Sequence, residues 1–377
     1  MNLFKRKKKE EPLSVQTAVS DSYQGSGYSY LGMNSAVVYE RKLYRFLRES
    51  VPLIDAAIAK LVRLVGSFRV STGNPRNDAA LAKFLREVQV NGCARGIDSF
   101  LAGYLDQLLT YGTAVGEMVL SRNGKNIAAL YQASLDHVEL TADGDPLNIR
   151  IRSIGPAGER KDIPYPGLVL CTTLMNEPGK VYGTSVLRGL PFVGEILLKI
   201  FHAVGTNWER VGNVRFAVSY KPGENERSFS RDRAAQIASE WSKAMKSREP
   251  KDFVTVGDVS IRVIGADNQI PDSQVPVRML LEQIVSKLSI PPFLLGLTWS
   301  STERMSSQQA DILTSELEFY RRQLEGCISR ICGLFLKLRG EPAEFRIEWD
   351  NINLQDEVEL ARARLLNAQA DAVKKGE

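Results

Sequence analysis

A single apolar stripe near residue 320 constrains this fold more than any other feature of the sequence. Its members are spaced three or four residues apart, as on one face of a helix: Leu313, Leu317, Tyr320, Leu324, Cys327, Ile331, Phe335 and Leu338. Ser306, followed by Gln309, has the form of a capping box, and Gly340 follows the last apolar residue. At a rise of about 1.5 Å per residue, this helix would span roughly 50 Å. The remaining elements must therefore be arranged around it.

A shorter helix and a loop precede the long helix. The shorter helix is predicted by one apolar face: Val277, Leu280, Leu281, Ile284 and Leu288. Pro291-Pro292 predicts its end near Ser289, because proline cannot donate a backbone hydrogen bond and restricts the residue before it. The following residues, 296–305, are mostly small and polar and include one tryptophan, Trp299. Loops of this kind typically face solvent or a partner.

The first half of the chain changes its apolar period from helical to extended. Residues 1–40 are polar and predict a flexible arm. Helical stripes then predict helices over 39–51, 52–65, 78–88 and 97–109, and Gly112 is placed to terminate the last of them. Alternating residues predict strands over 117–120 and 127–131 around an Asn123-Gly124 turn, and over 137–140, 148–152 and 168–172. This order indicates an α+β domain.

The second half contains a further long helix and a small mixed region. The helix carries Val193, Ile196, Leu197, Ile200, Phe201, Val204, Trp208 and Val211 on one stripe, with Pro191 at its first turn or at a kink. A strand over 214–220, a helix over 234–245 and a hairpin over 253–264 turning at Gly257-Asp258 follow. The chain closes with an acidic strand over 345–350 and an amphipathic helix over 355–372.

Composition excludes several classes of protein. Hydrophobic residues make up 44% and charged residues 25% of the 377, which is typical of a globular chain with two or more cores. No run of about 18 apolar residues predicts a membrane span. The four cysteines lack metal-ligand spacing, which favours a reducing cytoplasm and makes disulfides improbable.

Residues that could carry chemistry are few. No phosphate-binding glycine loop or nucleophile elbow is present, and the two histidines, His137 and His202, cannot easily build a metal site or a triad. Carboxylate pairs at Glu348 and Asp350 and at Asp356 and Glu357 could hold metal ions, as in nucleases. They could equally pair with an arginine of a neighbouring subunit. Trp299 could stack on a base, but a packing or subunit contact is favoured.

The order of several short motifs resembles that of tailed-bacteriophage portal proteins. The motifs are Tyr111-Gly112-Thr113-Ala114-Val115-Gly116-Glu117, Tyr182-Gly183-Thr184-Ser185-Val186-Leu187 at the opening of a helix, Ile290-Pro291-Pro292-Phe293-Leu294-Leu295-Gly296, Gln308-Gln309 at the start of a long helix, and Phe345-Arg346-Ile347-Glu348-Trp349-Asp350. None is specific alone, but their order and spacing across residues 40 to 365 is. The resemblance implies a ring-forming α+β chain with a helical stem, a small α/β clip, an α+β wing and a long helix under the wing.

The resemblance also implies where these parts lie. The boundaries are residues 1–40 for the arm, 41–183 for the wing, 184–212 for the first stem helix, 213–266 for the clip, 267–290 for the second stem helix, 291–306 for the tunnel loop, 307–350 for the long wing helix with its closing strand, and 351–377 for a short crown-like helix.

The function that the resemblance implies is structural, not enzymatic, and needs no cofactor or metal. Copies of the chain, usually twelve, would form a ring at one capsid vertex of a virion assembled in the host cytoplasm, and double-stranded DNA would pass through it. Expected partners are the large terminase subunit, the major capsid or scaffold protein and a head-tail adaptor, with no membrane.

Site residues follow from the same resemblance. The expected DNA-channel residues are Thr298, Trp299, Ser300, Ser301, Thr302 and Arg304, with hinges at Pro291, Pro292 and Gly296. The expected terminase- and adaptor-binding residues of the clip are Arg227, Arg231, Arg233, Lys243, Lys246 and Arg248. The competing view of the loop is a fixed plug held by Trp299.

The charge distribution fits a conduit. The basic cluster from Lys5 to Lys9 accounts for the formal charge of +5, so the rest of the chain is neutral. The cluster is read as a solvated arm, with binding to nucleic acid or an anionic surface as the alternative. A neutral body suits a channel through which DNA slides, because neutralising many phosphates would hold the DNA.

Two other functions remain open from the sequence. One is a metal-dependent nucleic-acid-processing enzyme that uses the carboxylates near Asp350. The other is a tail or baseplate structural protein, which would lack a continuous axial channel.

Overall fold

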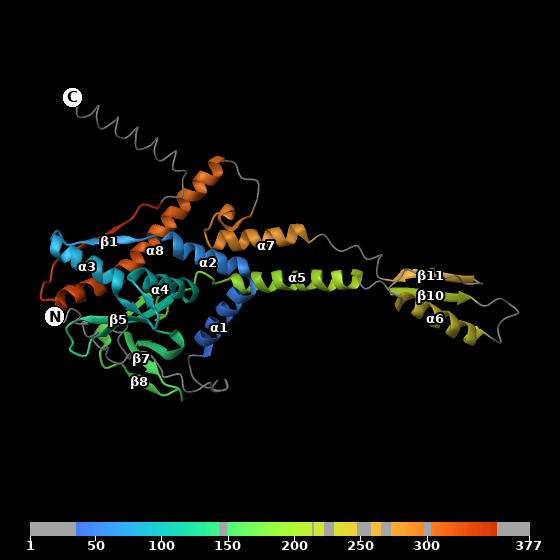
Figure 1. The fold of residues 1–377 in the computed structure, drawn as a ribbon, viewed down its shortest axis with the longest axis horizontal. Coiled ribbons are helices and arrows are strands. Elements are labelled where there is room, and N and C mark those ends of the chain that lie inside the picture. The colour runs from blue at the N-terminus through green and yellow to red at the C-terminus, as the bar shows by residue number, and fades with distance from the viewer. Residues whose placement is uncertain are drawn as a thin grey trace, which may run out of the picture. The chain divides into compact units, whose positions relative to one another are not determined.

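The structure, a computed structural model, describes residues 35–142, 149–212, 215–221, 230–246, 258–264, 273–297 and 303–352. The chain divides into two compact units, residues 1–194 with 280–377 (unit 1) and residues 195–279 (unit 2). Both helices and strands are abundant, so the predicted α+β class is confirmed (Figure 1). Within the described part of the chain, no helix is both long and apolar enough to cross a membrane.

Several helices lie wholly within unit 1, among them the long C-terminal one. They are α1 (Ser35–Ser50), α2 (Pro52–Leu64), α3 (Pro75–Glu87), α4 (Ile97–Tyr111) and α8 (Glu303–Leu338). Two further helices, α5 (Leu190–Gly212) and α7 (Gln274–Lys287), cross the boundary between the units. With 36 residues, α8 is slightly longer than the stripe predicted.

Three sheets belong to unit 1. The five-stranded sheet has the order β3 (Ala94–Arg95), β2 (Gln89–Val90), β5 (Ile127–Gln132), β4 (Thr113–Leu120) and β9 (Val169–Thr173), and only the β2–β5 pair is parallel. The three-stranded antiparallel sheet contains β6 (Val138–Ala142), β7 (Ile149–Ile154) and β8 (Arg160–Asp162). The third pairs β1 (Phe68–Ser71) with β12 (Arg346–Trp349) in antiparallel register.

Helix α4 lies at the centre of unit 1. It contacts α2 and the adjacent strand β4, and its apolar stripe is buried throughout: Ile97, Phe100, Leu101, Tyr104, Leu105, Leu108 and Leu109. Strand β4 is buried at every residue except its last, as expected of a strand with a neighbour on each edge. The predicted hairpin is present, with Gly124 at φ 67° in its turn.

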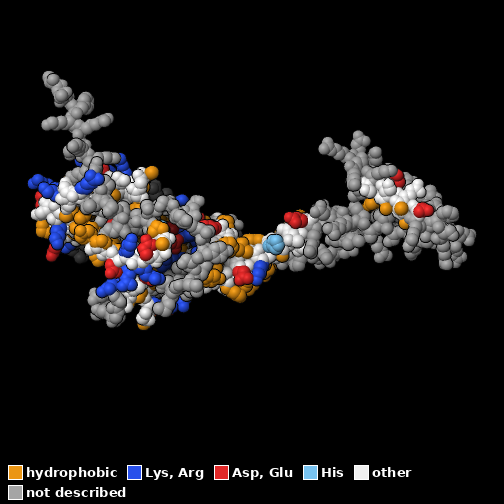
Figure 2. Space-filling view, turned by 90° about the horizontal axis from the view of Figure 1, so that it is seen from below, with side chains coloured by type: hydrophobic (Ala, Val, Ile, Leu, Met, Phe, Trp, Pro, Cys, Tyr) orange, Lys and Arg blue, Asp and Glu red, His pale blue; other side chains and the backbone are white. Residues whose placement is uncertain are grey.

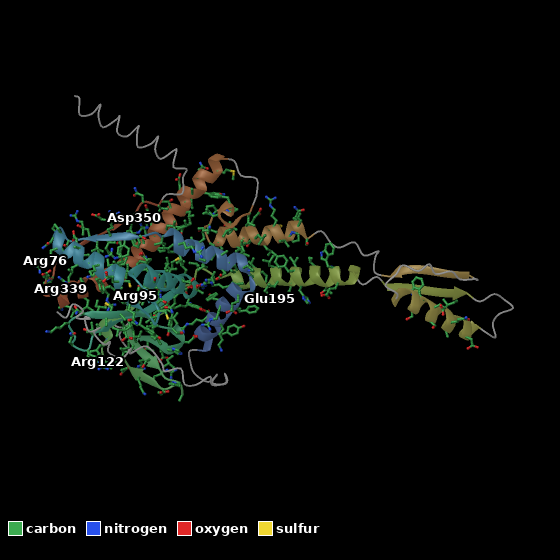
Figure 3. The ribbon with its side chains drawn as sticks, in the orientation of Figure 1. Arg76, Arg95, Arg122, Glu195, Arg339 and Asp350 are labelled. Atoms are coloured by element: carbon green, nitrogen blue, oxygen red, sulfur yellow. The ribbon has the colours of Figure 1, made fainter. Side chains whose placement is uncertain are left out.

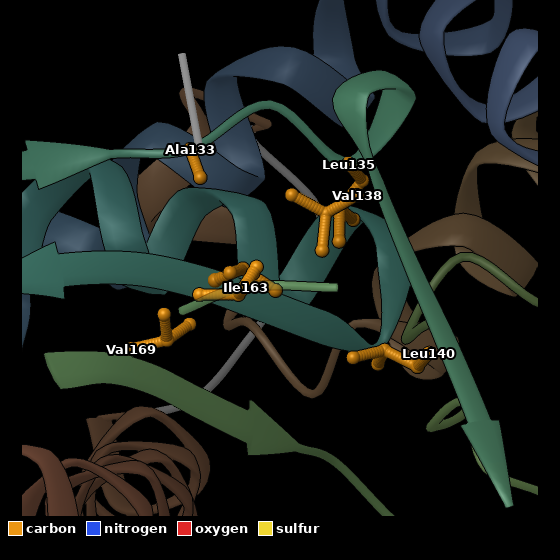
Figure 4. Close-up of a cluster of buried hydrophobic side chains, with 7 residues drawn as sticks. Ala133, Leu135, Val138, Leu140, Ile163 and Val169 are labelled. Carbon is orange, nitrogen blue, oxygen red and sulfur yellow. The ribbon is translucent and has the colours of Figure 1, made fainter. Parts of the chain in front are cut away.

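A second apolar cluster joins the two larger sheets. Its side chains come from β4, β6, β9 and the connecting segments, and they are Val115, Ala133, Leu135, Val138, Leu140, Ile163 and Val169 (Figure 4). Because residues far apart in sequence share this cluster, the sheets form one unit despite their separate hydrogen-bond ladders.

The two Tyr-Gly-Thr motifs of the sequence lie against each other. Gly112 ends α4 at φ 75°, and its carbonyl accepts a hydrogen bond from the Leu174 amide at 2.7 Å. A Cβ on Gly183 would lie 2.1 Å from that carbonyl, so only glycine fits. The Gly183 amide donates to Thr113 Oγ1 at 3.0 Å. Both motifs therefore serve one close crossing of two backbones.

Unit 2 contains most of α5, the start of α7 and a small α/β region. In that region β10 (Arg215–Lys221) pairs antiparallel with β11 (Asp258–Ile264), and α6 (Ser230–Lys246) lies between them in sequence. The strand, the helix and the second strand of the predicted hairpin are present in the predicted order.

Several element ends differ from the sequence prediction. Helix α5 begins at Leu190 and not near residue 184, because the Ser185 hydroxyl donates to the Thr110 carbonyl at 2.6 Å and residues 186–189 form turns. Pro191 therefore stands in the first turn, one of its two predicted places. Helix α8 begins at Glu303, so Ser306 lies inside it and is not its cap.

Other differences concern the shorter elements. Helix α3 starts at Pro75, where the Asn74 side chain accepts from the Arg76 amide. The predicted turn at Gly257-Asp258 is wrong at Asp258, because Asp258 is the first residue of β11 and pairs with Lys221 of β10. Strands β2, β3 and β8 were not predicted. Residues 253–257 and the predicted helix over 355–372 lie outside the described part.

Candidate functional site

The segment that leads into the predicted loop begins with a tightly hydrogen-bonded helix end. Ser289 follows α7 in the left-handed conformation, at φ 51°. Its amide donates to the Ser286 carbonyl at 3.2 Å, and the Ile290 amide donates to the Val285 carbonyl at 3.4 Å. This pair of bonds is a Schellman motif, in which glycine is the usual residue at the left-handed position. The end of α7 is thus fixed, at the cost of a strained serine.

The proline pair continues this fixed segment. Pro291 precedes a short 3₁₀ helix, η4 (Pro292–Leu295), which closes with the Leu294 amide donating to the Pro291 carbonyl at 3.1 Å. Gly296 follows at φ 75°, and the Leu297 amide reaches back to the Pro292 carbonyl at 3.1 Å. Of the three predicted hinge residues, only Gly296 has the backbone freedom that a hinge needs.

Burial holds the same segment against the body of unit 1. Leu288 and Ile290 are 3% and 2% exposed, Pro291 is buried, and η4 contacts α2. Thr298, Trp299, Ser300, Ser301 and Thr302 lie outside the described residues, as does the side chain of Arg304 at the start of α8. The structure therefore describes both anchors of the predicted loop.

The second anchor, α8, is fixed along its apolar stripe. Its residues Leu313, Leu317, Leu324, Ile328 and Ile331 are at most 1% exposed. Phe335 stacks on Phe84 of α3, with ring centroids 4.3 Å apart. Cys327, a member of the predicted stripe, and Cys332 are buried core residues.

Arg321 links α8 to the C-terminal end of α2. Its side chain is 7% exposed and donates two hydrogen bonds to the Val65 carbonyl, from Nε at 2.8 Å and from Nη2 at 2.6 Å. Its guanidinium carbon lies 5.0 Å from the centroid of the Trp349 ring in β12. The pKa of Arg321 is lowered by burial, against the attraction of Glu318 and Asp350. Arg321 was not predicted from the sequence. Its position, four residues after Leu317 and three before Leu324, places a charge on the apolar stripe and could have indicated a buried role.

The predicted clip residues cannot be placed. Arg227 and Arg248 lie outside the described residues, and the side chains of Arg231, Arg233, Lys243 and Lys246 in α6 are not described. The described backbone shows that four of the six lie on one helix.

The predicted carboxylate pair lies on an open surface. Glu348 faces Arg69 across the β1–β12 ladder, and both residues are exposed. Asp350 follows the strand, where Figure 3 shows it near the same ladder, and its amide donates to the Ser67 carbonyl at 3.0 Å. Among the residues that the structure describes, no three His, Cys, Asp or Glu side chains gather to hold a metal ion. Asp356 and Glu357 lie outside them.

The histidines do not join these residues. His202 is exposed on α5, and His137 closes a single 3₁₀ turn, η1 (Leu135–His137), before β6.

The fold is similar to that of chains in gene transfer agent particles. A chain in the virion of a native gene transfer agent particle has the same fold. It aligns over 92% of this chain and 92% of its own length, with a TM-score of 0.63 and 13% identity. A chain in the neck of a native gene transfer agent particle, computed with C12 symmetry, aligns over 85% of this chain and 89% of its own length, with a TM-score of 0.58 and 13% identity.

The remaining comparisons are weaker or empty. An HK97-family phage portal protein from Corynebacterium diphtheriae aligns over 80% of this chain and 92% of its own, with 13% identity and a TM-score of only 0.42. No known family of protein sequences matches the chain, and no curated protein does. The likeness thus lies in the fold, with 13% sequence identity.

Proposed function

We propose that this chain is a portal-type subunit, copies of which form a closed ring at one capsid vertex through which double-stranded DNA is packaged, retained and released. The observation that carries the proposal is the fold shared over 92% of the chain with a subunit of a gene transfer agent virion. The order of the portal-like motifs supports it independently. The C12 symmetry of the similar neck supports a ring of twelve.

Exposed apolar side chains of unit 2 provide a surface for ring contacts. Phe201 and Trp208 lie seven residues apart on one face of α5 and are 51% and 63% exposed. Val275 and Met279 lie four residues apart on α7 and are 62% and 60% exposed. Hydrophobic side chains are visible along α5 in Figure 2. Large apolar side chains exposed on a helix typically mark a protein interface, and a heterologous contact whose rotation closes gives a ring.

The loop after Gly296 is proposed to line the narrowest part of the channel. Its two anchors are fixed, by the Schellman turn on one side and the buried stripe of α8 on the other. Gly296 would then be the pivot, with Pro291 and Pro292 on the fixed side. Thr298, Ser300, Ser301 and Thr302 would exchange hydrogen bonds with DNA phosphates, and Arg304 would add attraction.

The α/β region of unit 2 is proposed to bind the large terminase subunit and later the head-tail adaptor. It is an antiparallel β10–β11 strand pair with α6 between the two strands in sequence, and it is inserted between α5 and α7. Its basic residues, among them Arg231 and Arg233, would complement an acidic partner. The capsid or scaffold protein would contact unit 1, and the ring would form in the host cytoplasm before joining the virion.

We also propose that the chain has no catalytic activity. The described carboxylates Glu348 and Asp350 lie on an exposed strand pair and not in a cleft. No specific observation favours the nucleic-acid-processing alternative or the tail alternative.

Deletion of 299–302 tests the channel. Because both anchors lie outside the deletion, the variant is expected to form rings of unchanged diameter in electron micrographs but to lose packaged DNA in a reconstituted procapsid. A matched four-residue deletion in the β4–β5 turn, 123–126, controls for general damage. If the loop variant packages and retains DNA as the parent does, the loop is not the channel constriction.

Charge reversal tests the partner surface. Arg231→Glu with Arg233→Glu is expected to weaken terminase capture on the ring, whereas Lys83→Glu with Arg86→Glu on α3 of unit 1 leaves it unchanged. Equal capture by both double variants would remove the clip assignment while leaving the ring intact.

A further inference from the structure

A pocket between α8 and β9 is unexplained by the proposed channel. It has a volume of about 330 Å³ and is formed where one face of α8 passes over strand β9 and Tyr104 in the middle of α4. Its walls include Gln323, Gly326 and Arg330 from α8, and Thr172 and Thr173 from β9. The three α8 residues lie three and four positions apart, so they share one helical face.

A glycine in α8 leaves this pocket open, and that glycine costs the helix stability. Gly326 stands in the middle of α8, where glycine is less favourable than alanine by about 1 kcal/mol. Close packing does not explain it, because a Cβ built there would have no atom within 4 Å. The glycine is also in the right-handed helical conformation, so it is not needed for a turn. What its missing side chain does provide is space beside Arg330.

Hydrogen-bond donors converge on the same space. Arg330 donates one bond, from Nη2 to the Gly167 carbonyl at 2.9 Å, and an arginine has five donors. The Gln323 amide has no partner among the described residues, although the side chain is half-buried. Thr172 Oγ1 accepts from the Tyr104 hydroxyl at 2.9 Å, so its own proton is available to donate.

The charge of the pocket is positive. No aspartate or glutamate of the described chain lines it. Arg330 acts on three neighbouring groups in the same direction: its charge opposes the rise that burial causes in the pKa of Tyr104, Cys171 and Cys327. Arg330 is thus the charged residue among those that line the pocket.

We infer that this pocket binds one small oxyanion, a phosphate or a carboxylate group, held by Arg330 with Gln323 and Thr172. A guanidinium matches the geometry of either anion through paired N–H donors. A volume of about 330 Å³ is large enough for such a group. The inference is independent of the ring and the channel.

Thermal unfolding of the full chain in inorganic phosphate tests the site. Sodium phosphate and sodium chloride are compared at equal ionic strength. Phosphate also stabilises proteins generally, because it is excluded from their surfaces, so the readout is the difference between variants. The wild-type Tm is expected to rise in phosphate by more than that of Arg330→Gln. Arg322→Gln, an exposed arginine of the same helix, should keep the wild-type response, and Arg330→Lys should keep part of it.

Gly326→Ala separates binding from folding. The substitution should raise the Tm in chloride, since alanine favours the helix, and should reduce the phosphate response, since its methyl group occupies the pocket. A merely structural role for this face would give the first effect without the second.

Sodium acetate in place of phosphate identifies the source of the anion. A response to phosphate alone supports a phosphate site, and a response to acetate that Arg330→Gln removes supports a carboxylate site. Equal responses of the wild type and Arg330→Gln to both salts would overturn the inference.

Discussion

Helices α4 and α5 are both strongly apolar, yet they differ in what covers them. Seven apolar side chains of α4 are buried between α2 and the central sheet. On α5, Phe192, Phe201 and Trp208 are 71%, 51% and 63% exposed. Apolar residues of α4 therefore stabilise the single chain, because their surface is removed from water on folding. Those of α5 need a second molecule to do the same.

The largest expected effect contrasts a phenylalanine from each helix. Phe100→Ala should lower the free energy of unfolding by about 3–5 kcal/mol, because it leaves a cavity in a packed core. Phe201→Ala should change it by less than about 0.5 kcal/mol, because the side chain is already exposed. Urea unfolding at subunit concentrations below assembly measures both. Similar losses would erase the contrast between the two helices.

Assembly should show the opposite order. Phe201→Ala with Trp208→Ala should raise the concentration needed for rings by about thirtyfold, equivalent to ~2 kcal/mol for aromatic residues at the centre of an interface. Light scattering over a dilution series measures the midpoint. Lys199→Ala with Glu195→Ala, an exposed ion pair of the same helix, is the control, and an equal shift in it would implicate general loss of α5 helicity.

Arg321 tests how unit 1 holds α8. Arg321→Ala should cost about 2–3 kcal/mol, since it removes charged hydrogen bonds to the Val65 carbonyl and leaves that carbonyl buried. The adjacent and exposed Arg322→Ala should cost less than about 0.5 kcal/mol. Chemical unfolding followed by tryptophan fluorescence measures both. If Arg322→Ala were the costlier change, the assigned link would be wrong.

A smaller gain is expected at the end of α7. Ser289→Gly should stabilise the chain by about 0.5–1 kcal/mol, because glycine adopts the left-handed conformation without the steric cost that serine bears. Ser286→Gly, inside the same helix, should instead destabilise it slightly. Melting curves of the two variants should therefore move in opposite directions, and a parallel movement would contradict the Schellman assignment.

The smallest effect concerns acid. Hydrogen bonds from Lys180 and Arg188 lower the pKa of Glu177 from its ordinary 4.5 to about 2. A lowered carboxyl pKa adds stability that is fully present above about pH 4.5 and is lost as the pH falls towards about 2. Glu177→Gln should flatten the decline of Tm over this window. Tm profiles of the two proteins that run parallel below pH 4.5 would show that the ion pairs do not matter for folding.

Much of this fold can be predicted from the sequence, because the patterns that indicate its elements involve residues close together in the chain. The apolar stripes of α4 and α8, the terminating Gly112 and the Asn123-Gly124 turn each rest on neighbouring residues. Strands β2, β3 and β8 were not predicted, because a strand of two or three residues is too short to show an alternating pattern. The start of α5 escaped because Ser185 is held by a hydrogen bond to Thr110, which is distant in sequence.

The candidate site residues are harder to predict from the sequence, because their roles depend on contacts with distant parts of the chain. Ser289 occupies a left-handed position at which glycine is usual. Arg330 is a candidate binding residue only because β9 forms the other wall of its pocket. The channel and clip residues rest on resemblance, and they remain predictions since their side chains are outside the described part. A local pattern predicts a helix, but it does not predict what the helix faces.

Native mass measurement of the intact assembly tests the central claim most directly. The account predicts a closed ring with a mass near twelve times the 41.9 kDa of the chain, and its partial dissociation in the variant that lacks Phe201 and Trp208. A single species at 41.9 kDa across micromolar concentrations and low to moderate salt would contradict the ring, and with it the channel.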